Sequence, residues 1–337
     1  MSPSQSIADL GEHGLIARLR ARVPASPPWV TLGIGDDAAA IAPEPGEQIV
    51  LTTDTLVEGV HFDSAFTALD AVGHKALAVN LSDLAAMGAA PRGVVLGLSL
   101  PETMAVPEFD ALVGGFLALA ARTKMPLVGG NITRSPGPIV VDVTAVGSAR
   151  ARRLITRGGG RPGDAMYVTG RLGAAATGLA VLRAGLRRAD LEADLVDCIA
   201  RHERPEPRLR AGQIAGRSRS VSAGVDLSDG LADGLRQVAE ASRTGVVVDA
   251  TLVPVHDGAR AWAARDGRDA LAVALSGGED YELLFAVPRR RTRAFLAAAG
   301  RWGGVPVTKI GQLTRESGAW LERDGRREPL PAGFVHF

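Results

Sequence analysis

The chain alternates strand-like and helix-like segments along most of its 337 residues. Residues 47–56 and 92–101 have the apolar, β-branched composition of strands. Residues 70–88 and 106–124 repeat apolar groups at helical spacing, and residues 138–149 form a further strand-like run. Segments of both kinds also recur in the second half of the chain. This alternation predicts α+β or α/β layers in both halves.

A basic, glycine-rich connector, RARRLITRGGGRPGD, occupies residues 150–164. A connector of this composition is typical of a domain boundary, and the chain length suggests about two domains. We therefore predict an N-terminal domain at 1–149 and a C-terminal domain at 150–337. In the latter, Pro205 and Pro207 interrupt a helical segment, and the last stretch of the chain reads as rich in turns.

The charge balance gives no electrostatic reason to expect nucleic acid or a membrane as partner. Lys and Arg together number 38 and Asp and Glu 37, so the formal net charge is +1. The arginine-rich run at 201–220 is interpreted as a solvated helical face. The sequence has no apolar run of membrane-spanning length, and residues 1–20 read as an amphipathic helix rather than a signal peptide, so we expect a cytoplasmic protein. The single cysteine, Cys198, is expected to be a buried structural thiol.

Acidic residues recur beside Gly, Ser or Thr at expected element ends. Asp36 and Asp37 are adjacent in GIGDDAA, where two carboxylates repel each other. The others are Asp54, Asp83, Asp226, Asp229, Glu279 and Asp280. Each alone is more often a helix cap or a turn residue. Together they indicate oxygen ligands for a hard cation, Mg²⁺ or Mn²⁺, to which Thr52 and Thr53 could add hydroxyl or carbonyl oxygens.

Two segments share Leu-Ser-Asp, at 81–83 and 227–229. We expect both at a loop-to-helix junction, where the serine can cap the helix and the aspartate lies in its first turn. An acidic metal site usually serves phosphate chemistry. The sequence has no G-x-x-x-x-G-K-[ST] loop, so a bound nucleotide would depend on the metal and a few arginines.

Several motifs together resemble the thiamine-monophosphate kinase family. They are GIGDDAA, TTDTLVEGVHF, KALAVNLSDLAAMGA, LITRGGGRPGD, DLSDGL and SGGEDYELLF, and the resemblance runs from the first of them almost to GFVHF at the C-terminus. The superfamily also includes aminoimidazole ribonucleotide synthetase, selenophosphate synthetase and a hydrogenase-maturation protein. The resemblance implies two α+β domains. The N-terminal domain would bind metal and ATP and form a homodimer whose sheets join into a barrel, and the C-terminal domain would complete the substrate site.

The resemblance also implies a reaction: ATP-dependent phosphorylation of thiamine monophosphate to thiamine diphosphate, the last step in making that cofactor. Transfer would be direct and in line, assisted by several Mg²⁺ ions, with no protein nucleophile. The implied metal ligands are Asp37, Thr52, Thr53, Asp54, Asp83, Asn131, Asp226 and Asp229. The implied ATP contacts are Gly130, Asn131, Arg157 and Ser228. The implied substrate contacts are His61, Glu279 and Phe334.

The chain departs from the family pattern at Asn131, in VGGNITRSPG, where the family commonly has an aspartate. An amide oxygen can bind Mg²⁺ but adds no charge, so one ion would be held more weakly unless Asp142 or a water compensates. The competing interpretation is that Asn131 is only a turn residue, because Gly-Gly-Asn is typical of turns.

Two alternative functions remain open on the sequence. The first is another ATP-using member of the superfamily. Selenophosphate synthetase would be expected to carry a reactive Cys or selenocysteine near the N-terminus, whereas the only cysteine here is Cys198. The other is a non-catalytic protein that binds nucleotide or metal on the same fold. The near-complete set of ligands counts against it.

Overall fold

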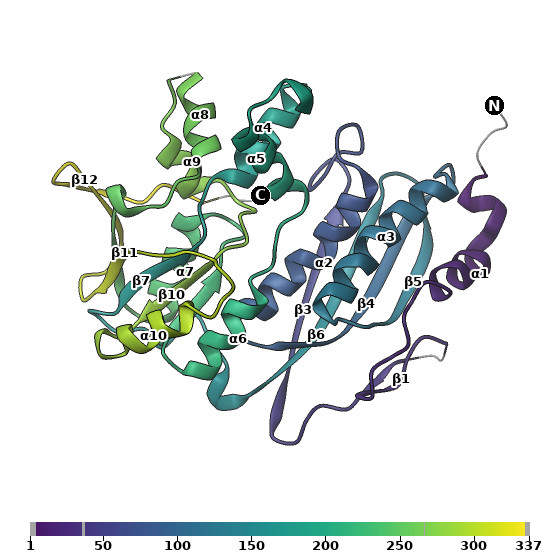
Figure 1. The fold of residues 1–337 in the computed structure, drawn as a ribbon, viewed down its shortest axis with the longest axis horizontal. Helices are drawn as coiled ribbons and strands as arrows, with labels where there is room; N and C mark the ends of the chain where they lie inside the picture. The colour runs from purple at the N-terminus through teal and green to yellow at the C-terminus, as the bar shows by residue number, and fades with distance from the viewer. Residues whose placement is uncertain (1–4, 36–37, 266, 334–337) are drawn as a thin grey trace. The chain divides into compact units, whose positions relative to one another are not determined.

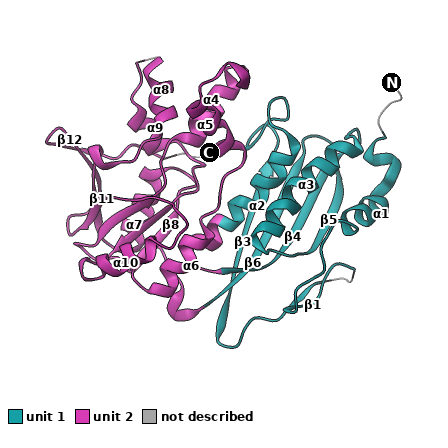
Figure 2. Ribbon diagram, viewed as in Figure 1, with its two compact units in different colours: residues 1–81, 90–149 teal, residues 82–89, 150–337 magenta. Residues whose placement is uncertain are grey.

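The computed structural model describes residues 5–35, 38–265 and 267–333. It divides into two compact units (Figure 2). Unit 1 comprises Met1–Leu81 and Ala90–Ala149, and unit 2 comprises Ser82–Ala89 and Arg150–Phe337. Each unit is described by itself.

Unit 1 is built around a four-stranded sheet in the order β3-β6-β4-β5. Strand β4 pairs with β5 in parallel and with β6 antiparallel. In chain order the elements are α1 (Ile7–Arg20), β1 (Val30–Leu32), β2 (Ala40–Ile41), β3 (Glu47–Val57), α2 (Leu69–Ala86), β4 (Ala90–Pro101), α3 (Val106–Thr123), β5 (Leu127–Ser135) and β6 (Val140–Arg150). The last turn of α2 belongs to unit 2.

Helices α2 and α3 run side by side across one face of this sheet (Figure 1). Two glycines allow the close approach, because a side chain at Gly73 would overlap the carbonyl oxygen of Leu112, and one at Gly115 would overlap that of Asp70. Phe109 and Phe116 of α3 are fully buried in the layer. Burial of this face is the main stabilising contribution to unit 1.

The other face of the sheet carries exposed apolar side chains. Along β3 the exposed residues alternate with less exposed ones, as the period of two in a strand requires. Leu51 is 66% exposed, Ile49 45%, and Val95 on β4 37%. An apolar sheet face of this kind usually marks an interaction surface.

Unit 2 contains a seven-stranded sheet in the order β13-β12-β9-β11-β7-β10-β8. The strands are β7 (Ala165–Thr169), β8 (Ala223–Asp226), β9 (Gly245–Asp249), β10 (Leu283–Val287), β11 (Val307–Thr314), β12 (Ala319–Arg323) and β13 (Arg326–Pro329). The helices are α4 (Ala174–Arg183), α5 (Ala193–Glu203), α6 (Leu209–Ser218), α7 (Leu231–Ala241), α8 (Asp257–Arg265), α9 (Ala270–Ser276) and α10 (Thr292–Ala299). Short 3-10 turns lie at Ala151–Arg153, Arg188–Asp190, Ala250–Leu252 and Arg289–Arg291.

Helices cover both faces of the central strands of this sheet. Met166 and Val168 of β7 pack into one apolar cluster with side chains of α7 and α9. Tyr167, between them in sequence, packs on the opposite face with Phe285 and with Phe295 of α10. The central strands β7, β8 and β10 are therefore apolar on both sides, which explains their continuous apolar runs.

The main elements predicted from the sequence are confirmed. The strands predicted at 47–56 and 92–101 are β3 and β4, and the helices predicted at 70–88 and 106–124 are α2 and α3. The C-terminal stretch that was predicted to be rich in turns forms α10 and β11 to β13, joined by turns with positive φ at Gly303, Gly304, Gly318 and Gly325. Among the described residues, no helix is long and apolar enough to cross a membrane.

Candidate functional site

In unit 2 one hydrogen bond joins the first Leu-Ser-Asp segment to the residue that precedes the second. The hydroxyl of Ser82 donates to Oδ2 of Asp226 over 2.7 Å, across 144 residues of sequence. Asp226 ends β8 and is only 6% exposed, and Ser82 is fully buried. The bond fixes one oxygen of the Asp226 carboxylate and places Asp83, the next residue after Ser82, at the same end of β8.

The expectation that both Leu-Ser-Asp segments begin a helix was wrong. Residues 81–83 lie near the C-terminal end of α2, not at its start. Residues 227–229 precede α7, but the residue at the N-cap is Gly230 rather than the serine. The two segments therefore lie in different backbone contexts, one inside a helix and one in the loop before a helix, and Ser82 of the first contacts Asp226, the residue before the second.

The loop before β10 brings Ser228 and Glu279 together. The amide of Glu279 donates to the carbonyl oxygen of Ser228 over 2.6 Å, and the amide of Tyr281 donates to that of Leu227 over 3.1 Å. Glu279 and Tyr281 have φ angles of 67° and 48°, in the left-handed region that non-glycine residues rarely adopt. Backbone strain of this kind is concentrated at functional sites. Ser228, an expected ATP contact, and Glu279, an expected substrate contact, are thus neighbours.

Glu279 also lies beside a buried histidine. Its Oε2 atom is 3.0 Å from Nδ1 of His202, a side chain that is 2% exposed and belongs to α5. The sequence interpretation did not include His202. The 77-residue separation explains why no local pattern shows this contact.

Asp280 caps a helix. The sequence left open whether it is a cap or one of the acidic residues that bind metal. Its carboxylate accepts the amide of Gly173 over 2.6 Å and that of Ala175 over 3.1 Å, at the start of α4. Burial raises the pKa of Asp280 to about 7, and these two backbone hydrogen bonds act in the opposite direction. Its carboxylate is therefore occupied within the fold.

Behind this loop lies a buried ion pair that sequence reasoning also missed. Glu282 is 1% exposed and receives a two-point contact from Arg208, with 2.7 Å between Nε and Oε2. The hydroxyl of Thr169 donates to the same carboxylate over 2.5 Å. Gly170 has a φ of 64°, and a side chain there would overlap this carboxylate. The network connects the loop to β7 and to the residue before α6.

In unit 1, Thr52, Thr53 and Asp54 are consecutive on β3. The hydroxyl of Thr53 donates to the carbonyl oxygen of Val143 over 3.1 Å, on the exposed face of the sheet. Neighbouring residues of a strand point to opposite faces, so Thr52 and Asp54 lie on the face that α2 and α3 cover. The side chain of Thr53 therefore points away from a site on that face.

Asn131 lies within strand β5, so the interpretation of it as a turn residue was wrong. It pairs with Gly97 of β4, which pairs in turn with Asp142 of β6. Paired residues share a face of the sheet, so Asn131 and Asp142 project from the exposed face on either side of Gly97. Asp142 accepts the hydroxyl of Thr55 over 2.9 Å.

Asp54 and Asn131 are therefore separated within unit 1. Their strands are the two edges of the sheet, three strand spacings or about 14 Å apart. Their side chains also leave opposite faces. One ion therefore cannot contact both side chains of the same chain.

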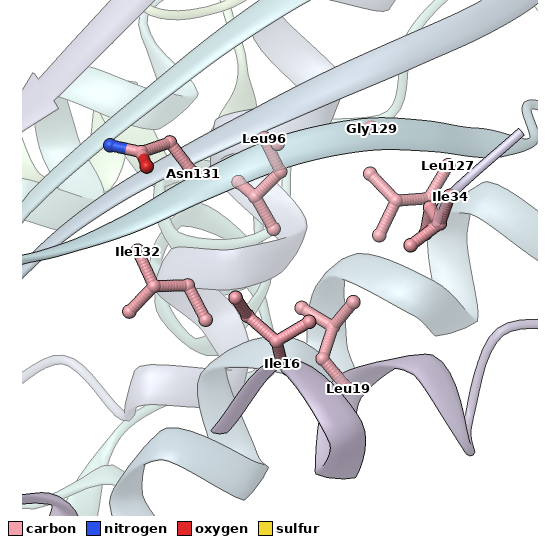
Figure 3. Close-up of a pocket in the computed structure, with 9 residues that line it drawn as sticks. Ile16, Leu19, Ile34, Leu96, Leu127, Gly129, Asn131 and Ile132 are labelled. Carbon is pink, nitrogen blue, oxygen red and sulfur yellow. The ribbon is translucent and has the colours of Figure 1, made fainter. Parts of the chain in front are cut away.

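Next to Gly130 is a small apolar cavity of about 70 Å³ (Figure 3). Ile16 and Leu19 of α1, together with Leu96 and Ile132 of the sheet, line it. The side chain of Asn131 points away from these apolar groups (Figure 3). A side chain at position 130 would overlap the carbonyl oxygen of Leu96, so the close backbone approach there requires glycine.

His61 lies in the segment after β3. Its Nδ1 atom accepts the amide of Val57 over 3.1 Å, so its other ring nitrogen, Nε2, can present a proton. The carbonyl oxygen of His61 accepts the ammonium group of Lys75 over 3.3 Å. Lys75 is 2% exposed on α2 and was missed by sequence reasoning, although a charged residue at an apolar helix position is a usable signal.

The predicted metal ligands fit a hard cation in their chemistry. Every donor is a carboxylate, hydroxyl, amide or carbonyl oxygen, the set that Mg²⁺ prefers. The described residues contain no group of three or more His, Cys, Asp or Glu side chains that could hold a metal ion. The predicted ligands are divided between the two units, and Asp36, Asp37 and the predicted substrate contact Phe334 lie outside the described residues. Arg157 is exposed in the connector before β7.

Cys198 is confirmed as a buried structural thiol. It is 0% exposed, and burial raises its pKa to about 12, so it is not a nucleophile. Its sulfur lies 3.4 Å from Nδ1 of His256, whose Nε2 is 2.9 Å from Asp197. The amide of Gly258 donates to the same Nδ1 over 3.1 Å, so this nitrogen is an acceptor and the group is not a catalytic triad.

Comparison with known proteins agrees with this architecture. Residues 35–149 match the family "AIR synthase related protein, N-terminal domain", and residues 161–321 match its C-terminal domain. The thiamine-monophosphate kinase of Salmonella typhimurium is 43% identical over 330 residues, which cover 97% of this chain and 98% of that protein.

Two solved structures are similar over nearly the whole chain. Thiamine-monophosphate kinase from Stenotrophomonas maltophilia K279a is 40% identical with a TM-score of 0.82, covering 92% of this chain and 96% of that one. A complex described as "AaThiL complexed with AMPPCP and TMP" is 31% identical with a TM-score of 0.78 and covers 100% of both chains. The chain belongs to the thiamine-monophosphate kinase family.

Proposed function

We propose that this protein transfers a phosphoryl group from ATP to thiamine monophosphate and releases thiamine diphosphate and ADP. The observation that carries the proposal is the identity to thiamine-monophosphate kinases over 97% of the chain. The relative solved with AMPPCP and TMP supports this pair of substrates. The reaction uses a divalent metal, as ATP-dependent kinases do, and we propose Mg²⁺ because the candidate ligands are hard oxygen donors.

The chain needs no nucleophile or general base of its own for this reaction. A phosphate monoester has a second pKa near ~6, so it is mostly dianionic at neutral pH and already nucleophilic. Bound Mg²⁺ would neutralise phosphate charge. The protein's carboxylates would hold the ions, and its polar groups would align the two phosphates for in-line transfer.

The residue roles are part of the proposal. In unit 2, Asp83, Asp226 and Asp229 would bind metal, Ser228 and Arg157 would contact ATP, and Glu279 would contact the substrate. The hydrogen bond between Ser82 and Asp226 and the contact between Ser228 and Glu279 support this grouping. In unit 1 we propose Thr52, the Thr53 carbonyl and Asp54 as metal ligands, Gly130 and Asn131 as ATP and metal contacts, and His61 as a substrate contact. Asp37 and Phe334 keep their expected roles in metal and substrate binding.

We further propose that residues 1–149 act as the metal-binding, ATP-binding and dimerisation domain and that residues 150–337 complete the substrate site. The apolar sheet face with Leu51, Ile49 and Val95 supports a homodimer in which this face is covered and the sheets form a barrel. A monomeric mass by light scattering would contradict the dimer.

The activity is tested with purified protein, ATP, Mg²⁺ and either thiamine monophosphate or free thiamine, with products separated by chromatography. We expect thiamine diphosphate and ADP from the monophosphate and no turnover of free thiamine. The physical reason is that the acceptor must present a phosphate oxygen to the metal site. Turnover of free thiamine, or none of the monophosphate, would overturn the proposal.

Asn131→Asp is expected to lower the Mg²⁺ concentration that gives half-maximal activity. A carboxylate binds a hard cation more strongly than an amide oxygen does. Asn131→Leu, which removes the oxygen, is expected to raise that concentration or abolish activity. The measurement is a Mg²⁺ titration of initial rates for the three proteins.

Thr133→Asp is the matched control for this titration. Thr133 is exposed and lies two residues further along β5, on the same face as Asn131. An aspartate at this position adds the same charge as Asn131→Asp close to the same place. We expect this control to leave the Mg²⁺ requirement unchanged. Superimposable curves for all the variants would mean that position 131 does not contact metal.

A further inference from the structure

Unit 2 contains a polar cavity of about 660 Å³ that the proposed reaction does not use. It lies where β10 ends and where β7 and β8 begin, with Asp164 and Ser222 among its lining residues. Asp226 and Glu282 lie at the other end of the same strands. This cavity, here called the basic cavity, is therefore separated by the length of a strand from Asp226 and from the loops that carry Ser228 and Glu279. Arg157, the proposed ATP contact in the connector, lies two residues before Gly159 of the cavity lining.

Four arginines line the basic cavity: Arg161, Arg289, Arg290 and Arg291. Guanidinium groups stay charged at any physiological pH. In the part of the chain that the structure describes, no ion pair joins any of the four to a carboxylate. Arg291 donates to the carbonyl oxygen of Arg219 over 2.7 Å, which orients its side chain without neutralising it.

The one carboxylate in the lining is already engaged. Oδ2 of Asp164 accepts the hydroxyl of Ser222 over 2.6 Å and the backbone amide of Arg161 over 3.0 Å. Asp164 is 7% exposed, so it serves the loop that carries Arg161 rather than the exposed guanidinium groups. Even counting its charge in full, the lining carries an excess of three positive charges.

We propose that the basic cavity binds a polyphosphate group, at a site distinct from the one that carries out phosphoryl transfer. Arginine presents a planar fork of donors that matches phosphate oxygens, and several arginines in one concave site favour a multiply charged anion over a single carboxylate. A bound polyphosphate also relieves the mutual repulsion of the four cations.

A small molecule fits this cavity better than nucleic acid does. The lining residues include no aromatic side chain on which a base could stack. The formal net charge of the whole chain is only +1, so the chain as a whole does not attract nucleic acid electrostatically. The recognised chemistry is therefore the phosphate chain itself, whether free pyrophosphate or the diphosphate end of a larger molecule.

The test is calorimetric titration of the full chain with inorganic pyrophosphate in the presence of EDTA, which prevents metal-dependent binding elsewhere. We expect saturable binding with a Kd in the millimolar range or below. Arg290→Gln is expected to raise this Kd about tenfold, through loss of a charge-assisted contact. Arg293→Gln is the matched control, because Arg293 is an exposed arginine three residues away on α10 that does not line the cavity. The Kd of pyrophosphate for this variant should equal that for the unchanged chain.

Parallel titrations with ADP and thiamine diphosphate distinguish the sources of the phosphate group, and the tightest ligand identifies the occupant. Absence of pyrophosphate binding overturns the proposal, as does equal weakening by Arg290→Gln and Arg293→Gln. A single-stranded oligonucleotide that binds more tightly than pyrophosphate and loses affinity in Arg290→Gln also overturns it, in favour of nucleic acid. None of these outcomes depends on the reaction proposed above.

Discussion

Asp226→Asn is expected to reduce kcat for phosphorylation of thiamine monophosphate by about 10²- to 10³-fold, the usual cost of removing one strong electrostatic contact at a phosphoryl-transfer site. The substitution changes charge and almost nothing else. The amide oxygen of Asn can still accept the hydroxyl of Ser82, which now lies 2.7 Å from the carboxylate. The fold should therefore be retained, and circular dichroism and the melting temperature should be close to those of the unchanged chain.

Two further variants show whether charge or hydrogen bonding matters at this position. Ser82→Ala removes the hydroxyl but leaves the carboxylate, so we expect a loss of about tenfold or less, since a neutral hydrogen bond contributes about 1 kcal/mol. Asp190→Asn, in an exposed 3-10 turn of the same unit, is the control for removing a negative charge and should be fully active. An Asp226→Asn protein with a near-normal rate at saturating Mg²⁺ would show that Asp226 is structural.

Asp83→Asn should give a loss similar to that of Asp226→Asn. Asp83 follows Ser82 in α2, and Ser82 contacts Asp226, so the backbone of residue 83 lies at the end of β8, where we propose that both carboxylates bind metal. If the two bind the same ion, the double variant should lose little more than either single variant, because effects at one site are not additive. Multiplicative losses would assign them to separate ions.

Local sequence patterns were sufficient to predict the main elements of unit 1. Strands β3 and β4 and helices α2 and α3 have clear periodicity because each has one buried face. Strand β5 was missed because Gly129, Gly130 and Asn131 have the composition of a turn. Pairing with β4 overrides that local preference, and glycine is needed at 130 because a side chain there would overlap Leu96.

The candidate site was only partly predictable for a similar reason. The residue types predict oxygen ligands for a hard cation. The local composition of a strand, however, does not determine its position in the order of the sheet. Asp54 and Asn131 lie on opposite edges and opposite faces because the order is β3-β6-β4-β5. Asp280 is beside the predicted substrate contact Glu279 in sequence and yet caps α4. Contacts across long sequence separations, such as Arg208 with Glu282, leave no periodic signal.

Arg208→Met is expected to destabilise unit 2 by about 3–5 kcal/mol, because it leaves the charge of Glu282 buried without its partner. Glu282 is 1% exposed, and its remaining partners are the hydroxyl of Thr169 over 2.5 Å and the more distant guanidinium of Arg201 at 3.9 Å. In a thermal melt this corresponds to a decrease of roughly 10 °C or more. Arg187→Gln, which breaks an exposed ion pair with Asp190, is the control and should change the melting temperature little.

The double variant Arg208→Met/Glu282→Gln separates the loss of the ion pair from the loss of packing. Gln keeps an oxygen for the hydroxyl of Thr169 and carries no charge, so most of the stability lost in Arg208→Met should return. Glu282 directly follows the loop of Glu279, Asp280 and Tyr281, so we expect Arg208→Met also to raise the KM for thiamine monophosphate. The double variant should restore this KM together with the stability. Equal melting temperatures for Arg208→Met and the double variant would contradict this expectation. They would show that the Arg208 side chain stabilises unit 2 by packing and that neutralising the charge of Glu282 does not matter.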